Sequence, residues 1–169
     1  MQKINQKYIN NLVLKALEED LKPNGDITTK LLNSKNKIVQ AKIISKQNGI
    51  ISGINFCKAA FKLLERKSKF LQRIKDGKKV KRNQIIAEIT AKTKTILIAE
   101  RTALNFLNHA SGISTITNQY VSKVKNKTKI CCTRKTTPNL RLLEKYAVRK
   151  GGGYNHRYNL SDEILIKEN

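Results

Sequence analysis

Apolar residues recur at helical spacing in two parts of the first hundred residues. Between Tyr8 and Leu21 they form one stripe, which predicts an amphipathic helix: Ile9, Leu12, Val13, Ala16, Leu17 and Leu21. The run Pro23-Asn24-Gly25 is expected to end this helix. A second, shorter helix is predicted over residues 56–64.

Short apolar runs of strand length occupy the rest of this region. We predict strands over residues 38–45, 70–74, 85–89 and 95–99. Asn48-Gly49 is a turn signal followed by the apolar run IISGI, and Asp76-Gly77 marks a turn between two strands. The first hundred residues therefore have an α+β pattern.

The pattern changes near residue 100. Residues 101–124 predict one long helix with a partly small inner stripe: Leu104, Leu107, Ser111, Ser114 and Thr115. Beyond it we predict a strand, a helix that ends at three glycines, and a second strand: KICCT (129–133), residues 139–150, and EILIK (163–167). Alternating strands and helices are typical of an α/β barrel or a layered α/β sheet.

The formal net charge of +23 has three interpretations: nucleic-acid binding, a lysine-rich composition, and a local site for small polyanions. Because the lysines are dispersed and form no long basic tail, we favour biased composition together with a local anion site. Aromatic residues make up only 5% of the chain, which argues against a single-strand-binding module. We expect no specific nucleic-acid partner.

The remaining composition bears on location. No apolar run reaches 18 residues, so no membrane span is predicted. The N-terminus has neither the continuous apolar segment nor the cleavage site of a signal peptide. The three cysteines, Cys57, Cys131 and Cys132, suit neither a disulfide framework nor a zinc site. We expect them to be reduced, buried thiols in a cytoplasmic protein.

Cations follow the two strands predicted after residue 124. Arg134-Lys135 comes directly after KICCT, and Lys167 closes EILIK. Since reactive groups of α/β barrels lie at the C-terminal ends of strands, these side chains would share one rim, within reach of His156-Arg157. Such a cluster binds carboxylates and phosphates. Taken singly, each basic residue is more readily a solvated surface charge, and only its recurrence on two strands brings the two interpretations level. Gly151–Gly153 is a helix end more readily than a phosphate cradle.

Four strings resemble one enzyme family in order and spacing. They are EEDLKPNGDITT (18–29), ERTALNFLNHASGIST (100–115), TRKTTPNLRLLEKYAVRKGGGYNHR (133–157) and LIKEN (165–169). All four resemble the quinolinate phosphoribosyltransferases. The resemblance implies an N-terminal α/β sandwich domain, placed at 1–103, followed at 104–169 by the first part of an incomplete α/β barrel.

The resemblance also implies an activity. Family members are pentosyltransferases that convert quinolinate and phosphoribosyl pyrophosphate to nicotinate mononucleotide, pyrophosphate and carbon dioxide, with Mg²⁺, in de novo NAD biosynthesis. The matching positions that would line the site are Arg101, Thr133, Arg134, Lys135, His156, Arg157 and Lys167. Among them, Lys135 and Lys167 are the expected catalytic residues. Family members act as homodimers with shared sites, so Arg101 is expected in the partner's site.

Some motifs of the family pattern are not found in this sequence. The acidic contacts to metal and ribose and the glycine-rich loops for the 5′-phosphate have no counterpart up to Asn169. Glu144 and Asp162 do not match those roles, so we expect no metal ligand in this chain. The resemblance therefore implies an incomplete enzyme.

Three alternatives stay open. A molybdenum-uptake-associated homologue has the same architecture. Residues 70–99 loosely resemble a lipoyl- or biotinyl-carrier hairpin, but no lysine lies in a clear carrier turn. A non-catalytic anion- or nucleic-acid-binding module would rest on charge alone.

Overall fold

The computed structural model describes residues 4–31, 36–125 and 127–168. Residues 1–3 and 32–35 of the expected N-terminal domain lie outside the described residues, as do residue 126 and Asn169, the last residue of the LIKEN string. Within the described ranges, no helix is both long and apolar enough to cross a membrane.

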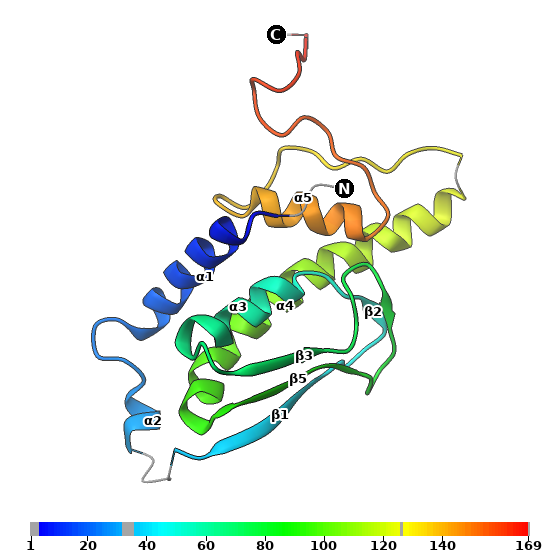
Figure 1. Ribbon diagram of the computed structural model, residues 1–169. Coiled ribbons are helices and arrows are strands. Elements are labelled where there is room, and N and C mark those ends of the chain that lie inside the picture. Colours follow the sequence, from blue (N-terminus) through cyan, green and yellow to red (C-terminus); the bar gives the residue numbers. More distant parts are fainter. Residues whose placement is uncertain (1–3, 32–35, 126, 169) are drawn as a thin grey trace.

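A three-stranded antiparallel sheet forms one layer of the fold, with strand order β1-β5-β3 (Figure 1). Its strands are β1 (Ile38–Ile44), β3 (Lys69–Gln72) and β5 (Ile85–Lys92). Ile89 of the central strand faces Ala41 on one side and Phe70 on the other, and it is 1% exposed. The predicted strands 38–45, 70–74 and 85–89 are confirmed. A separate antiparallel pair joins β2 (Gly49–Ile50) and β4 (Lys79–Val80).

Helices pack together to bury the apolar side of this layer. They are α1 (Gln6–Leu21), α3 (Ile54–Leu64) and α4 (Thr93–Val124). The rings of Phe56 and Phe106 stack between α3 and α4, with centroids 5.5 Å apart. In α1, Ile9, Val13 and Leu17 are buried at i, i+4 and i+8, which places the predicted stripe in the core. The predicted helices over 8–21 and 56–64 are confirmed.

The prediction of a strand over residues 95–99 is wrong, because these residues begin α4. Local β-branched character favours a strand here. However, Thr95, Ala99 and Phe106 are buried at helical spacing, so packing against α3 decides the conformation. The long helix predicted over 101–124 is thus confirmed, with an earlier start. The expected domain boundary at 103/104 falls inside it, and that division stays a prediction.

A short helix, α2 (Ile27–Leu31), was not predicted. Its first turn is capped by Asp26, whose Oδ1 accepts a hydrogen bond of 3.0 Å from the Thr29 amide. The Thr29 hydroxyl donates to the other carboxylate oxygen. These bonds lower the pKa of the Asp26 carboxyl, the hydroxyl contact contributing most.

The two strands predicted beyond residue 124 are corrected by the structure. In place of a KICCT strand there is one parallel bridge, between Cys131 and Tyr154. Residues 163–167 are irregular, with Ile164 92% and Ile166 88% exposed. A strand is stable only beside a partner strand, and the described residues offer EILIK none.

Helix α5 (Arg141–Lys150) confirms the helix predicted over 139–150 and packs across α4. The hydroxyl of Ser114 on α4 donates to the Ala147 carbonyl at 2.7 Å, where both residues are buried. Figure 1 shows α5 lying over α4 on one side of the molecule, with the orange-to-red C-terminal segment projecting beyond it. This arrangement sets where the two candidate site segments begin.

Candidate functional site

The glycines that end α5 allow the chain to run back against the segment before that helix. A Cβ built on Gly151 would lie 2.4 Å from the Ser114 carbonyl oxygen, so only glycine fits there. The Tyr154 amide then donates to the Ile130 carbonyl at 2.8 Å, and the Cys132 amide donates to the Tyr154 carbonyl at 2.9 Å. These bonds hold two segments side by side: the first arginine segment, residues 131–137, and the second arginine segment, residues 154–158.

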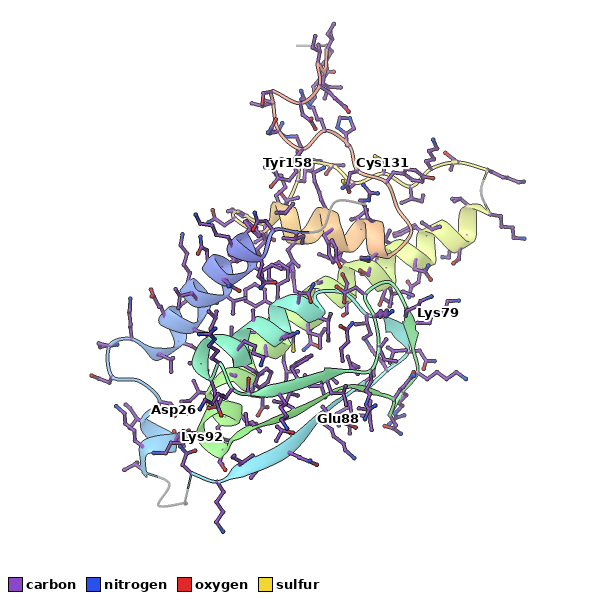
Figure 2. The ribbon with its side chains drawn as sticks, viewed as in Figure 1. Asp26, Lys79, Glu88, Lys92, Cys131 and Tyr158 are labelled. Atoms are coloured by element: carbon purple, nitrogen blue, oxygen red, sulfur yellow. The ribbon has the colours of Figure 1, made fainter. Side chains whose placement is uncertain are left out.

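Both segments open onto one cavity of about 390 Å³. We call it the cationic cavity, and its lining residues are Thr133, Arg134, Lys135, His156, Arg157, Leu165 and Lys167. Six of these lining residues were named from the sequence, and the structure brings those six together. Leu165 is an addition that no sequence signal indicated. Figure 2 shows Cys131 and Tyr158, one from each segment, on the side of α5 from which the C-terminal segment projects.

Local hydrogen bonds shape each segment. The Lys135 amide donates to Thr133 Oγ1 at 3.1 Å, which tightens the first segment into a turn. In the second, His156 Nδ1 accepts from the Arg157 amide at 2.8 Å, which places the proton of the neutral imidazole on Nε2. Arg157 Nη1 donates to the Glu163 carbonyl at 2.9 Å, which ties the C-terminal segment to the cavity.

Two guanidinium nitrogens of the cavity have no hydrogen-bond acceptor among the described residues. They are the Nε atoms of Arg134 and Arg157, and both are buried from solvent. A buried, charged donor without an acceptor is costly, and polar groups of this kind are normally satisfied. No lining residue is an Asp or Glu, so a bound anion is the kind of ligand that could supply these acceptors. The site is therefore suited to a ligand with several carboxylate or phosphate oxygens.

Arg101 is the predicted site residue that the structure leaves apart. It lies on α4, is exposed, and does not line the cationic cavity. Leu97, Ile116 and Tyr120 are also exposed on α4, at 41%, 56% and 57%. Helix α4 therefore exposes large apolar side chains along its length as well as Arg101.

A second, smaller cavity of about 300 Å³ lies beside the cationic cavity and shares Thr133 and Lys135 with it. At its edge, His109 Nε2 on α4 lies 3.0 Å from Glu144 Oε1 on α5. The other oxygen of Glu144 accepts from the Thr137 amide at 3.3 Å. Glu144 thus fixes the end of the first arginine segment rather than serving the cationic cavity.

The cysteines only partly follow the sequence prediction. All three are free thiols, but only Cys57 is buried, whereas Cys131 is exposed and Cys132 is half-buried. Burial raises the pKa of the Cys57 thiol to about 12. The expectation of three buried thiols is therefore wrong for the adjacent pair, because the segment expected to be an interior strand lies at the surface.

The described residues do not fit a resident magnesium ion. Mg²⁺ prefers carboxylate and water oxygens, whereas the cavity is lined by cations, a threonine, a histidine and a leucine. Across 4–31, 36–125 and 127–168, no group of three or more His, Cys, Asp or Glu side chains could hold a metal ion.

Comparisons with known proteins bear on both halves of the chain. Residues 26–111 match the family described as quinolinate phosphoribosyl transferase, N-terminal domain, and residues 113–169 match its C-terminal domain. The chain is 41% identical over 165 residues to a Bacillus subtilis protein named "Probable nicotinate-nucleotide pyrophosphorylase (carboxylating)", covering 97% of this chain and 55% of that protein. A Mycobacterium leprae nicotinate-nucleotide pyrophosphorylase is 39% identical over 163 residues, covering 93% of this chain and 56% of the relative.

A solved structure gives the same result. The nicotinate-nucleotide pyrophosphorylase of Francisella tularensis superposes with a TM-score of 0.93 at 39% identity, covering 98% of this chain and 59% of the other. The mixed helix-and-strand fold expected from the sequence, a sheet domain followed by the start of a barrel, is thereby supported. The chain spans a little over half the length of these relatives.

Proposed function

Because this chain belongs to the quinolinate phosphoribosyltransferase family, we propose that its cationic cavity binds quinolinate beside phosphoribosyl pyrophosphate. The proposed activity is a pentosyl transfer with decarboxylation, which yields nicotinate mononucleotide for NAD biosynthesis. The observation that supports it most is the pair of buried Nε atoms, on Arg134 and Arg157, in a cavity without carboxylates. A dicarboxylate supplies the oxygens that these two donors lack.

The residue types suit the two substrates. Quinolinate carries two carboxylates, and Arg134 and Arg157 offer planar forks that can each hold one of them. Lys135 and Lys167 carry point charges suited to a polyphosphate. Thr133 and His156 would add directional contacts to the substrates. These roles follow from the resemblance and from the shared cavity.

The chemistry needs positioning and charge more than a nucleophile from the protein. The pyridine nitrogen forms a bond to ribose C1 while the bond from C1 to the pyrophosphate oxygen breaks, and its electron pair leaves with pyrophosphate. The ring is then cationic. The carboxylate next to the nitrogen departs as carbon dioxide, and the electron pair left on the ring carbon takes a proton. The cations of the cavity stabilise the leaving polyphosphate.

Magnesium enters this proposal as part of the polyphosphate substrate. No Asp or Glu lines the cationic cavity. In this proposal, Lys135 and Lys167 balance the negative charge of the pyrophosphate. No step of the proposed reaction is assigned to a metal held by the described residues.

The proposed partner is a second copy of this chain. Arg101 is exposed on α4 and lies outside the cavity of its own protomer, on a helix that also exposes large apolar side chains. A homodimer that covers this face would carry Arg101 toward the partner's cavity, where it would add a further cation for the substrate. The cytoplasmic location expected from the sequence stays a prediction.

Calorimetry with quinolinate tests the proposed function, with random-sequence double-stranded DNA as a second titrant. We expect saturable quinolinate binding, whereas DNA binding should be weak and should vanish with added salt. A protein that binds DNA tightly but shows no heat with quinolinate would contradict the proposal in favour of a nucleic-acid-binding module. Binding of neither titrant would contradict the proposed quinolinate site as well.

A further inference from the structure

We propose that Lys145 and Arg141 are positioning residues that hold the two arginine segments at the separation a dicarboxylate needs. This inference rests on the proposed function of the cationic cavity. Neither residue lines that cavity. They lie four positions apart, on one face of α5, and each contacts both arginine segments.

Each of the two residues bridges the two arginine segments, and Lys145 forms the inner bridge. Its side chain is almost fully buried, at 2% exposure, although lysine is rarely buried without a partner. Its ammonium donates to the His156 carbonyl at 2.7 Å and lies 3.2 Å from the Cys132 thiol. Cys132 comes directly before Thr133, and His156 comes directly before Arg157. One ammonium therefore contacts both segments, in each case at the residue directly before a cavity-lining residue.

Arg141 forms the outer bridge, one helical turn earlier. Its Nε donates to Thr136 Oγ1 at 3.0 Å in the first segment. Its Nη1 donates to the Tyr158 carbonyl at 3.2 Å in the second. Between the two bridges lie Arg134 and Arg157, one in each segment. Contacts with α5 on both sides of the two arginines thus fix how far apart their segments lie.

The burial of Lys145 is costly for folding alone. Among the described residues it forms no ion pair with Asp or Glu, and its contacts are one carbonyl and one thiol. Taking an ammonium out of water with so little compensation opposes folding. The buried lysine has a function if the site must bind two carboxylates at once. Small errors in the positions of the two arginines would then weaken bidentate recognition strongly.

The test compares Lys145→Met and Arg141→Met with Arg149→Met, a control that removes an exposed cation of the same helix. Calorimetry measures the affinity of each variant for quinolinate and for nicotinate, which carries one carboxylate. We expect Lys145→Met and Arg141→Met each to lower quinolinate affinity about tenfold, because a displaced cavity arginine then loses a charge-assisted contact with one carboxylate, and nicotinate affinity by much less. Arg149→Met should leave both affinities unchanged.

The ratio of the two affinities separates positioning from a general loss of structure, which would lower both alike. Amide hydrogen exchange gives a second readout that needs no ligand. Lys145→Met should speed exchange at the Cys132 and Tyr154 amides, which join the segments, whereas Arg149→Met should not. If the unaltered protein binds no quinolinate, the proposed function fails, and exchange alone decides the positioning role. Unchanged ratios, or unchanged exchange at both amides, would overturn it.

Discussion

The hydroxyl of Tyr146 donates a hydrogen bond of 2.8 Å to Oδ2 of Asp76, although the two residues are 70 positions apart. Asp76 also accepts from the backbone amides of Gly53 and Ile54, at 3.1 and 3.2 Å, at the start of α3. One carboxylate therefore caps α3 and ties it to α5. Burial raises the pKa of Asp76 overall, while the bond from Tyr146 opposes that rise.

Tyr146→Phe should destabilise the protein at neutral pH. The lost bond to a charged acceptor corresponds to about 1.5–3 kcal/mol of the free energy of unfolding. Removing it raises the pKa of Asp76 further, so the deficit should shrink as pH falls and the carboxyl becomes protonated. Urea unfolding at several pH values measures this. Tyr120→Phe, an exposed tyrosine on α4, is the control, and a pH-independent deficit would contradict the assignment.

Gly151→Ala should weaken the packing of α5 on α4. The added Cβ would lie 2.4 Å from the Ser114 carbonyl oxygen and 2.7 Å from Thr117 Cβ, both on the neighbouring helix. Overpacking of this kind costs about 1–3 kcal/mol in the free energy of unfolding. Gly112→Ala is the matched control, because nothing lies within 4 Å of that position. It should stabilise α4 by about 0.5–1 kcal/mol, and equal effects in urea unfolding would refute the α4–α5 contact.

The thiols should differ sharply in reactivity. Cys131 is exposed, whereas Cys57 is fully buried and its pKa is raised to about 12. Burial and the adjacent Cys132 thiol also raise the pKa of Cys131. Since the thiolate is the reactive form and Cys131 is exposed, a thiol reagent at pH 8 should label Cys131 in the folded protein and Cys57 only on unfolding. Mass spectrometry of the labelled peptides measures both rates. Early labelling of Cys57 would mean that the core around α3 opens readily.

Arg101→Met should affect ligand binding only where two chains associate. Arg101 lies outside the cavity of its own protomer, so quinolinate affinity should not change at protein concentrations that keep the chain monomeric. At concentrations where analytical ultracentrifugation shows a dimer, the variant should bind quinolinate more weakly, roughly tenfold for one lost charge-assisted contact. A loss of affinity in the monomer would place Arg101 in its own cavity.

Hydrophobic periodicity predicted most helices and strands of the first hundred residues, because there the local pattern and the packing agree. Ile89 and its neighbours alternate as a central strand should, and Val13 and Leu17 keep a helical stripe. The strand prediction for residues 95–99 is wrong because their β-branched side chains favour a strand, whereas their contacts with the core are those of a helix. The strand prediction for EILIK is wrong for another reason: an apolar segment of strand-like sequence forms no strand without a neighbouring strand to pair with.

The candidate site was predictable in part. Arg134 and Arg157 belong to strings that resemble the family, and the structure places them on one cavity with their neighbours. The bridging contacts of Lys145 could not be read from the sequence. They depend on α5 crossing beneath both segments, and a lysine within a helix resembles a surface residue until its surroundings are known.

The central claim is that the cationic cavity recognises quinolinate through its paired arginines, and a titration of two variants tests it most directly. Arg134→Met removes one guanidinium from the cavity, and Arg66→Met removes an exposed one from the turn between α3 and β3, so each lowers the net charge by one. We predict that Arg134→Met weakens quinolinate binding ten- to a hundredfold, about 1.5–3 kcal/mol, while Arg66→Met binds like the unaltered protein. Equal affinities for the two variants would contradict the claim.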